Sequence, residues 1–233
     1  MILSLFDYSG EWSKPYVKAG YTVYRVDLLH PVGYSRAPDG ARLVGLDLGD
    51  MDRVALLLEL LHGRRVHGIL ACPPCDCWTR ASAWLWKKWD EDGTSARSMR
   101  LVDNTLEIIE LLTPDFWALE NPPGRLWRSP ASVRKSGPGL RQDVLGEPRL
   151  SFRQYEYGGW SPDDPQSGQH KATYIWGNFN IPEQKPVAPM VNQRWKKEKS
   201  GTCGNIQTMG SRNKRERERT PSGFSKAFFE ANR

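Results

Sequence analysis

Short apolar segments alternate with helix-like segments over the first 120 residues, and this alternation limits the possible folds more than any other feature. Five runs have the length and composition of strands, at residues 2–6, 21–28, 42–48, 66–71 and 116–119. Helical spacing of apolar residues is found between them, over residues 54–61 and 101–112. Strands and helices that alternate in this way predict a parallel sheet covered by helices.

The remainder of the chain is less regular. Residues 124–148 are rich in Gly, Pro, Ser and Arg, which predicts a long loop. Two strand-like runs follow, at residues 151–157 and 172–179, and they fit a hairpin at the edge of the sheet. Residues 224–231 predict a final short helix. The expected class is therefore α/β, with a mostly parallel sheet and an antiparallel edge hairpin.

Polar and reactive residues stand at the end of each predicted strand. In an open parallel sheet, ligands bind at the carboxyl ends of the strands. A glycine at such a position lets a ligand approach the backbone. Acidic side chains there can bind a ribose and an adenine amino group, and a thiol and a carboxyl group can take part in a reaction. In strand order, these residues are Asp7, Ser9 and Gly10, then Asp27, then Asp47, then Pro73, Pro74 and Cys75, then Glu120 and Asn121.

The chain of 233 residues suits one domain of ordinary size and carries a net charge of +6. Residues 194–219 hold nine Lys and Arg against three Glu, and a second basic stretch covers residues 125–153. Such surfaces attract phosphate backbones, although a solvated surface that keeps the protein dissolved explains the charge equally well. The ten tryptophans suit either a core or platforms on which bases stack.

The composition excludes several classes of protein. No run approaches the roughly 18 apolar residues of a membrane span, and the first residues have the pattern of a strand and lack that of a signal peptide. Four cysteines in a chain of this length do not make a disulfide framework, so we expect a reducing cytoplasm.

Three of the cysteines are close together, at Cys72, Cys75 and Cys77, which leaves two alternatives open. With Cys203 or His67 they could form a zinc site, and Cys72 and Cys75 alone have the spacing of a redox pair. No second Cys-x-x-Cys pair exists, and two prolines lie within the first. We therefore expect no metal, and we interpret Cys72 and Cys77 as small buried residues.

Four segments together resemble the DNA (cytosine-5) methyltransferases, in particular the short, phage-type members. The resemblance is good over residues 1–125, fair over 151–180 and weak elsewhere. Its segments are residues 5–13 (LFDYSGEWS) with the Ala-Gly-Tyr that follows at 19–21, residues 72–79 (CPPCDCWT), residues 119–122 (LENP) and residues 171–176 (KATYIW).

The resemblance implies a Rossmann-like fold that uses S-adenosylmethionine (AdoMet), and it implies DNA as the substrate. Residues 1–180 would form the catalytic domain, with residues 124–150 as a basic loop insert. Residues 181–233 would form a basic segment that contacts DNA and packs back on the domain. We expect a monomer. Because a chain of this length has no room for a large target-recognition domain, we expect any preference for a DNA sequence to come from loops.

The resemblance also implies roles for single residues. Cys75 would be the nucleophile and Glu120 the acid at ring nitrogen 3 of a flipped cytosine, with Asn121 and Lys171 beside them. AdoMet would lie with its carboxylate and ribose near Ser9, Gly10 and Asp27, and its adenine near Asp47. The full set of implied cofactor-binding residues is Phe6, Asp7, Ser9, Gly10, Asp27, Asp47 and Pro73.

The sequence departs from the family at several positions. Tyr8 stands where a glycine is usual, Asp27 where a glutamate is usual, and Asp76 where a glutamine is common. Trp78 replaces a phenylalanine, and the late arginine motif is absent, so that Lys171 is a stand-in. Two other functions remain open: a DNA-binding protein without catalysis on the same scaffold, and an enzyme that transfers a modified group such as carboxymethyl or acts on another base.

Overall fold

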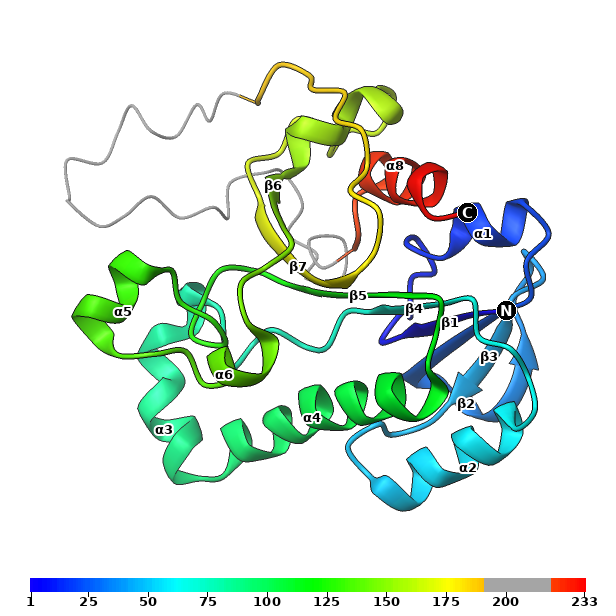
Figure 1. Ribbon diagram of the computed structural model, residues 1–233, viewed down its shortest axis with the longest axis horizontal. Coiled ribbons are helices and arrows are strands. Elements are labelled where there is room, and N and C mark those ends of the chain that lie inside the picture. Colours follow the sequence, from blue (N-terminus) through cyan, green and yellow to red (C-terminus); the bar gives the residue numbers. More distant parts are fainter. Residues whose placement is uncertain (191–218) are drawn as a thin grey trace.

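Seven strands form a single sheet in the order β3-β2-β1-β4-β5-β7-β6. The protein is described by a computed structural model that covers residues 1–190 and 219–233 (Figure 1). The first five strands in sequence run parallel to one another, and β7 runs antiparallel to both β5 and β6. The strands are β1 (Ile2–Leu5), β2 (Val23–Arg36), β3 (Arg42–Gly45), β4 (Gly68–Ala71), β5 (Phe116–Asn121), β6 (Leu150–Arg153) and β7 (Ala172–Asn178).

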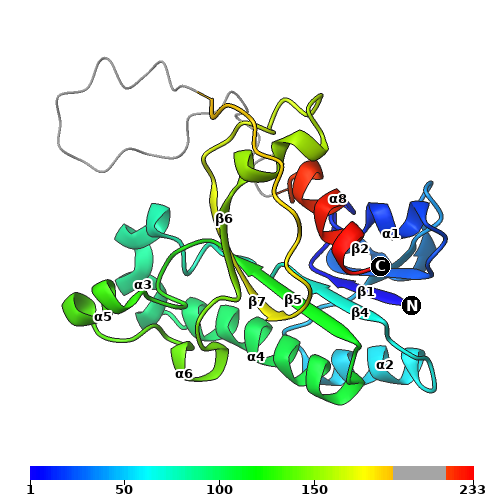
Figure 2. The same cartoon turned by 45° about the horizontal axis from the view of Figure 1, so that its top comes forward.

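Helices cover both faces of this sheet. Figure 1 shows α2 and α4 below the sheet and α1 and α8 above it. Figure 2 shows that α3 and α5 stand beyond the ends of β4 and β5, at the carboxyl side of the parallel strands. The helices are α1 (Lys14–Lys18), α2 (Met51–Leu61), α3 (Trp86–Glu91), α4 (Thr94–Leu112), α5 (Pro130–Ser136), α6 (Gln142–Leu145) and α8 (Ser222–Ala231), with 3-10 helices η1 (Arg80–Leu85) and η2 (Gln154–Trp160).

Each face of the sheet buries its own hydrophobic core. Along β1, the side chains of Leu3 and Leu5 join the core beneath the sheet, while Ile2 joins the core above it. This division follows from the pleat of a strand, in which successive side chains point to opposite faces. Buried residues of α2 and α4, such as Leu57 and Ile108, complete the lower core.

Aromatic side chains dominate the upper core, where α8 packs against α1 and the segment before it. Phe224 and Phe228 of α8 contact Trp12 with ring centroids 5.9 and 5.5 Å apart. Phe229 lies edge-on to Tyr16 at 5.0 Å. The last helix therefore belongs to the packed body of the molecule, although it follows the least regular part of the sequence.

The second strand is longer than the sequence predicts, because it bends back past β3. It runs parallel to β3 as far as Asp27, opposite Gly45, and after a register shift Arg36 lies opposite Arg42. A Cβ atom on Gly45 would lie 2.1 Å from the carbonyl oxygen of Pro31, so only glycine permits this approach. Asp27 consequently lies next to the bend, at the carboxyl side of the sheet.

The observed class agrees with the sequence-based expectation: a mostly parallel sheet, with β6 and β7 as an antiparallel pair at one edge. The expected strand at residues 151–157 stops at Arg153, since the next residues form η2. The expected loop at 124–148 contains α5 and α6, and α4 begins at Thr94, earlier than its apolar spacing indicates.

Two further expectations concern the basic segment and the membrane. Most of the basic segment expected to contact DNA falls at residues 191–218, outside the described residues. Of the described helices, none combines the length and the apolar character that crossing a bilayer requires.

Candidate active site

The ends of β1, β4 and β5 lie side by side in the middle of the sheet. Ala71 of β4 stands opposite Leu119 of β5, so Cys72 and Glu120 follow at the same level of the two strands. On the other side of β4, the amide of Cys72 donates to the carbonyl of Leu5, at 3.1 Å. The predicted first, fourth and fifth strand ends are therefore neighbours in space, as the position of a ligand site in such a sheet requires.

The segment that contains Cys75 is bonded to the segment that follows Glu120. The side-chain amide of Asn121, which is fully buried, donates to the carbonyl of Pro73 at 3.0 Å. Further along both segments, the amide of Arg125 donates to the carbonyl of Trp78 at 2.8 Å. The amide of Trp78 in turn donates to the carbonyl of Cys75 at 2.9 Å, which turns the chain sharply after the cysteine. These bonds fix the two loops to each other on both sides of Cys75.

A buried arginine strengthens this connection. Arg125 donates from Nε to the carbonyl of Cys77 at 2.8 Å, and it forms a two-pronged ion pair with Asp90 of α3 at 2.8 and 2.9 Å. It also donates to Ser95 of α4, and its guanidinium lies 4.8 Å from the ring centroid of Trp86. Because the N–H donors of this planar guanidinium bond to three segments at once, Arg125 holds the cysteine loop, α3 and α4 in one arrangement.

Glu120 is a buried carboxyl beside a lysine. Its side chain is 15% exposed, and the Nζ atom of Lys171 lies 4.0 Å from Oε1. Burial raises the pKa of Glu120 above the usual range, and the positive charge of Lys171 acts in the opposite direction. Two of the four residues implied as catalytic, Glu120 and Lys171, thus form an ion pair in the structure.

The three clustered cysteines differ in their surroundings. Cys77 is buried and Cys75 is partly exposed. The thiol of Cys72 lies 3.8 Å from the hydroxyl of Thr220, and burial, followed by the charge of Glu120, raises its pKa well above that of a free thiol. A thiol held in the neutral form is a poor nucleophile, which argues against Cys72 as the reactive cysteine.

The described residues contain no group of three or more His, Cys, Asp or Glu side chains arranged to hold a metal ion. The zinc alternative named Cys203 or His67 as the fourth ligand. Cys203 lies outside the part of the chain that the structure covers, and His67 precedes β4, at the opposite end of that strand from Cys72.

The loop after β1 is fixed by polar side chains of its own. The carboxylate of Asp7 is buried and accepts from the hydroxyls of Ser4 and Ser13, at 2.7 and 2.6 Å. Arg25 of β2 donates to the hydroxyl of Ser13 and to the carbonyl of Gly10. A Cβ atom on Gly10 would lie 2.4 Å from Cζ of Arg25, so this glycine makes room for the guanidinium.

Three other implied cofactor residues lie along the same edge. Phe6 directly follows β1 with a φ of 59°, a conformation that a residue other than glycine adopts at a cost in energy. Ser9 is exposed. The carboxylate of Asp27 accepts from the amide of Leu29 at 2.8 Å, while burial raises its pKa.

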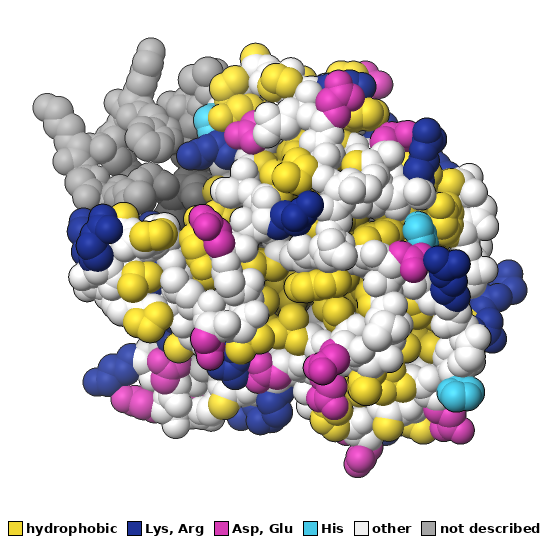
Figure 3. Space-filling view, viewed as in Figure 1, with side chains coloured by type: hydrophobic (Ala, Val, Ile, Leu, Met, Phe, Trp, Pro, Cys, Tyr) yellow, Lys and Arg dark blue, Asp and Glu magenta, His cyan; other side chains and the backbone are white. Residues whose placement is uncertain are grey.

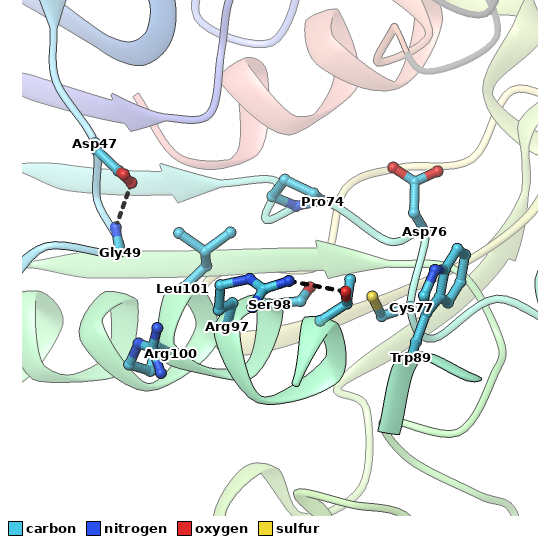
Figure 4. Close-up of a pocket in the computed structure, with 11 residues that line it drawn as sticks. Asp47, Gly49, Pro74, Asp76, Cys77, Trp89, Arg97, Ser98, Arg100 and Leu101 are labelled. Carbon is cyan, nitrogen blue, oxygen red and sulfur yellow. Dashed lines mark hydrogen bonds between the residues drawn. The ribbon is translucent and has the colours of Figure 1, made fainter. Parts of the chain in front are cut away.

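A hollow of about 610 Å³ opens between the ends of the strands and the start of α4 (Figure 4). Asp47 and Gly49 line one end, and a bond of 2.8 Å joins the Asp47 carboxylate to the Gly49 amide. Pro74 and Leu101 form apolar parts of the wall. The hollow thus begins at the predicted third strand end and reaches the loop that carries Cys75, with Cys77, Trp89, Ser98 and Arg97 among its other lining residues.

Sequence reasoning missed the residues that fix these loops. Arg125 and Asp90 are 35 residues apart in the sequence, so neither suggests the other as a partner. One signal was present: Arg125 directly follows Asn-Pro-Pro-Gly, and Gly124 forms a bridge with Thr79 of the cysteine loop. Thr220 could not have been found, because its proximity to Cys72 depends on how α8 packs.

No family model and no curated protein matches the chain. Among solved structures, it is similar to one provisionally named a DNA modification methyltransferase encoded within a prophage (E. coli), with 17% identity and a TM-score of 0.44. The match covers 80% of this chain and 52% of that one, so this chain spans about half the length of that protein. At this level the similarity concerns only the course of the backbone.

Proposed function

We propose that this protein is a DNA methyltransferase that transfers a methyl group to carbon 5 of cytosine. The observation that carries the proposal is the connection between the two loops. Cys72 and Glu120 follow neighbouring strands at the same level, and the bond from Asn121 to Pro73 holds the Pro-Pro-Cys segment against the Glu-Asn segment. Activation of a cytosine ring needs a thiol and a carboxyl group whose pKa is raised, and the two adjoining loops carry Cys75 and Glu120.

Cys75 supplies the nucleophile. Its thiolate adds to carbon 6 of cytosine, a carbon–sulfur bond forms, and the electron pair of the carbon 5–carbon 6 double bond becomes available at carbon 5. Carbon 5 then takes the methyl group of the donor, whose sulfur keeps the electron pair of the broken bond. Loss of the carbon 5 proton to a solvent base restores the double bond and expels the Cys75 thiolate. Two prolines before the cysteine restrict the backbone and so favour a fixed position of the thiol.

Glu120 stabilises the charge that moves onto the ring. A carboxyl with a raised pKa holds a proton closer to neutral pH, so it can donate to ring nitrogen 3 as carbon 6 is attacked. Lys171 lies within ion-pair distance of Glu120 and supplies a positive charge beside the cytosine carbonyl. Asn121 acts indirectly, since its side chain holds the Pro73 carbonyl.

Of the seven residues implied to bind AdoMet, Asp47 lines the hollow and the other six do not, so the hollow would hold the adenine end of the cofactor. AdoMet would supply a methyl group on a positively charged sulfur. A volume of about 610 Å³ lies within the range of small-molecule sites, roughly 300–1,000 Å³. The Asp47 carboxylate would accept from the adenine amino group, with Pro74 and Leu101 on the faces of the ring. Asp27, beyond the lining of the hollow, would hold the ribose at the parallel end of β2.

DNA is the proposed substrate because basic side chains gather where the strands end. Arg134 and Lys135 on α5 and Lys87 and Lys88 on α3 are all exposed. Figure 3 shows basic side chains at the left margin, where these two helices stand. A cytosine within a duplex lies out of reach of Cys75, so the base must rotate out of the stack.

Methyl transfer from labelled AdoMet to DNA, followed by mass spectrometry of the nucleosides, tests the proposal. We expect 5-methylcytosine from the wild-type protein and from Cys72→Ser, and none from Cys75→Ser, which still binds AdoMet. A new modified nucleoside on another base, or an unmodified cytosine pool, would contradict the cytosine assignment. A carboxymethylated cytosine in the DNA of cells that express the protein would keep the site and require a carboxylated donor in place of AdoMet.

A DNA-binding protein without catalysis is the second candidate. It is favoured by the packing at the first loop, where the Arg25 guanidinium fills the space beside Gly10 and the Tyr8 ring lies against His30 with centroids 5.4 Å apart. In the same experiment this candidate predicts that the wild-type protein binds DNA, takes up no AdoMet and leaves the DNA unmodified.

A further inference from the structure

Four tryptophans lie in the segment from the cysteine loop through α3, and one of them is exposed while the other three are packed against the protein. Trp78 is fully buried, Trp86 packs against the Arg125 guanidinium, and Trp89 packs partly buried against the lower core. Trp84 of η1 is 80% exposed. Burial of a large aromatic side chain stabilises a protein by about 1.5–3 kcal/mol, so exposure of this ring forgoes a gain that its neighbours obtain.

The exposed ring is carried by a rigidly attached segment. The hydroxyl of Ser82 donates to the carbonyls of Asp76 and Thr79, which ties η1 back to the cysteine loop. Arg125 holds α3, the direct continuation of η1, through its ion pair with Asp90. Trp84 therefore keeps a defined position relative to Cys75, nine residues earlier in the chain.

Exposed cations flank Trp84 on both sides in the sequence. Arg80, Lys87 and Lys88 are exposed on the same segment. Four acids lie on the same stretch: Asp90 is paired with Arg125, Glu91 lies 3.9 Å from Lys87 in a pair that is largely exposed to solvent, and Asp76 and Asp92 are exposed. An exposed indole ring among exposed cations is the combination with which proteins bind single nucleic-acid strands, since the ring stacks on a base and the cations contact phosphates.

We propose that Trp84 binds DNA by stacking on a base beside the nucleotide that enters the active site. The inference rests on the proposed function, because it takes the partner of this edge of the sheet to be DNA. Helix α3, which directly follows Trp84 and η1 in the chain, lies beyond the carboxyl ends of β4 and β5 (Figure 2). Base stacking on an aromatic ring tolerates any sequence, so Trp84 contributes affinity and position without selecting a target.

Binding of a labelled single-stranded oligonucleotide of mixed sequence, followed by fluorescence anisotropy, tests this directly. Trp84→Ala weakens binding by about 5- to 150-fold, the range that corresponds to one base–aromatic stack, whereas Trp84→Phe stays close to wild type. Leu111→Ala is the matched control. Leu111 is 57% exposed and lies in the last turn of α4, toward the opposite end of the sheet, so its replacement leaves the affinity unchanged.

Salt dependence separates stacking from charge. In Trp84→Ala the slope of log affinity against log salt concentration equals that of the wild-type protein, because every cation that faces a phosphate is still present. Replacement of Lys87 and Lys88 by Ala lowers the slope by about 0.7 for each phosphate that is no longer neutralised on a single strand, and replacement of the exposed Arg64 does not.

The outcomes distinguish this inference from the proposed function. If the wild-type protein methylates DNA and Trp84→Ala binds the oligonucleotide as tightly as wild type, only the role of Trp84 is wrong. If Trp84→Ala loses affinity but no variant transfers a methyl group, the catalytic proposal fails and Trp84 remains a DNA-binding residue. A wild-type protein without affinity for DNA contradicts both, and equal losses in Trp84→Ala and Leu111→Ala overturn the stacking role.

Discussion

At the scale of single residues, Glu120 is the group whose surroundings bear most directly on the proposed chemistry. Burial raises its pKa, and for a carboxyl this means that the folded state favours the protonated form. The folded state then loses stability as pH rises from the ordinary glutamate range through the raised pKa, because burial opposes the charged form. A neutral glutamine of the same shape carries no such penalty.

Glu120→Gln is therefore expected to abolish methyl transfer and to increase stability relative to wild type as pH rises. At pH values below the ordinary glutamate range, where Glu120 is protonated in both states, the two proteins should have the same free energy of unfolding. Urea unfolding of both proteins over a pH series measures this difference. A Glu120→Gln protein that is less stable at neutral pH would show that the ion pair with Lys171 outweighs the burial penalty.

At the scale of elements, two arginine–aspartate pairs offer a direct comparison. Arg125 and Asp90 join the segment after β5 to α3, and Arg141 and Asp103 join α6 to α4. Both pairs are two-pronged, but the Arg125 side chain is 6% exposed and that of Arg141 is 30% exposed. Arg125→Ala is expected to cost about 1–3 kcal/mol of unfolding free energy, because it leaves the buried Cys77 carbonyl without its donor, while Asp90 is 51% exposed and regains water.

Arg141→Ala is the matched control, with an expected cost of about 0–1 kcal/mol. Chemical denaturation of the two variants measures both values, and the rate at which Cys75 reacts with a thiol reagent reports whether its loop has moved. Similar losses of stability in the two variants, with no change at Cys75, would contradict the view that Arg125 holds the cysteine loop in place.

Some of these elements could be predicted from the sequence alone, and others could not. The strands at residues 2–6 and 66–71 were predictable because each is a short, mainly apolar run, as is typical of a strand buried on both faces. The placement of Cys75 and Glu120 on adjoining loops followed from parallel strand order. No helix was predicted over Arg80–Glu91, and the position of α3 there depends on Arg125, a contact between segments far apart in sequence.

At the scale of the whole molecule, the last helix and the basic segment before it have different expected roles. Phe228 is fully buried in the upper core, so Phe228→Ala is expected to cost about 3–5 kcal/mol. Removal of everything after residue 190 would therefore unfold the upper core as well as remove charge. Thermal unfolding of Phe228→Ala, compared with Leu111→Ala at an exposed position, measures the contribution of α8.

Charge substitution tests the basic segment without disturbing that core. Arg219 already pairs with Glu11 and Asp164, so it contributes to structure, whereas the basic residues at 194–217 lie outside the described part of the chain. Replacing Arg212, Lys214, Arg215 and Arg217 by Gln keeps the chain length and α8 intact. If these side chains bind phosphates, the slope of log affinity for duplex DNA against log salt falls by about 0.9 for each phosphate that is no longer neutralised, at unchanged thermal stability. An unchanged slope would show that none of these four side chains contacts a phosphate, and the electrostatic part of the affinity would then come from other cations, such as those of α3 and α5.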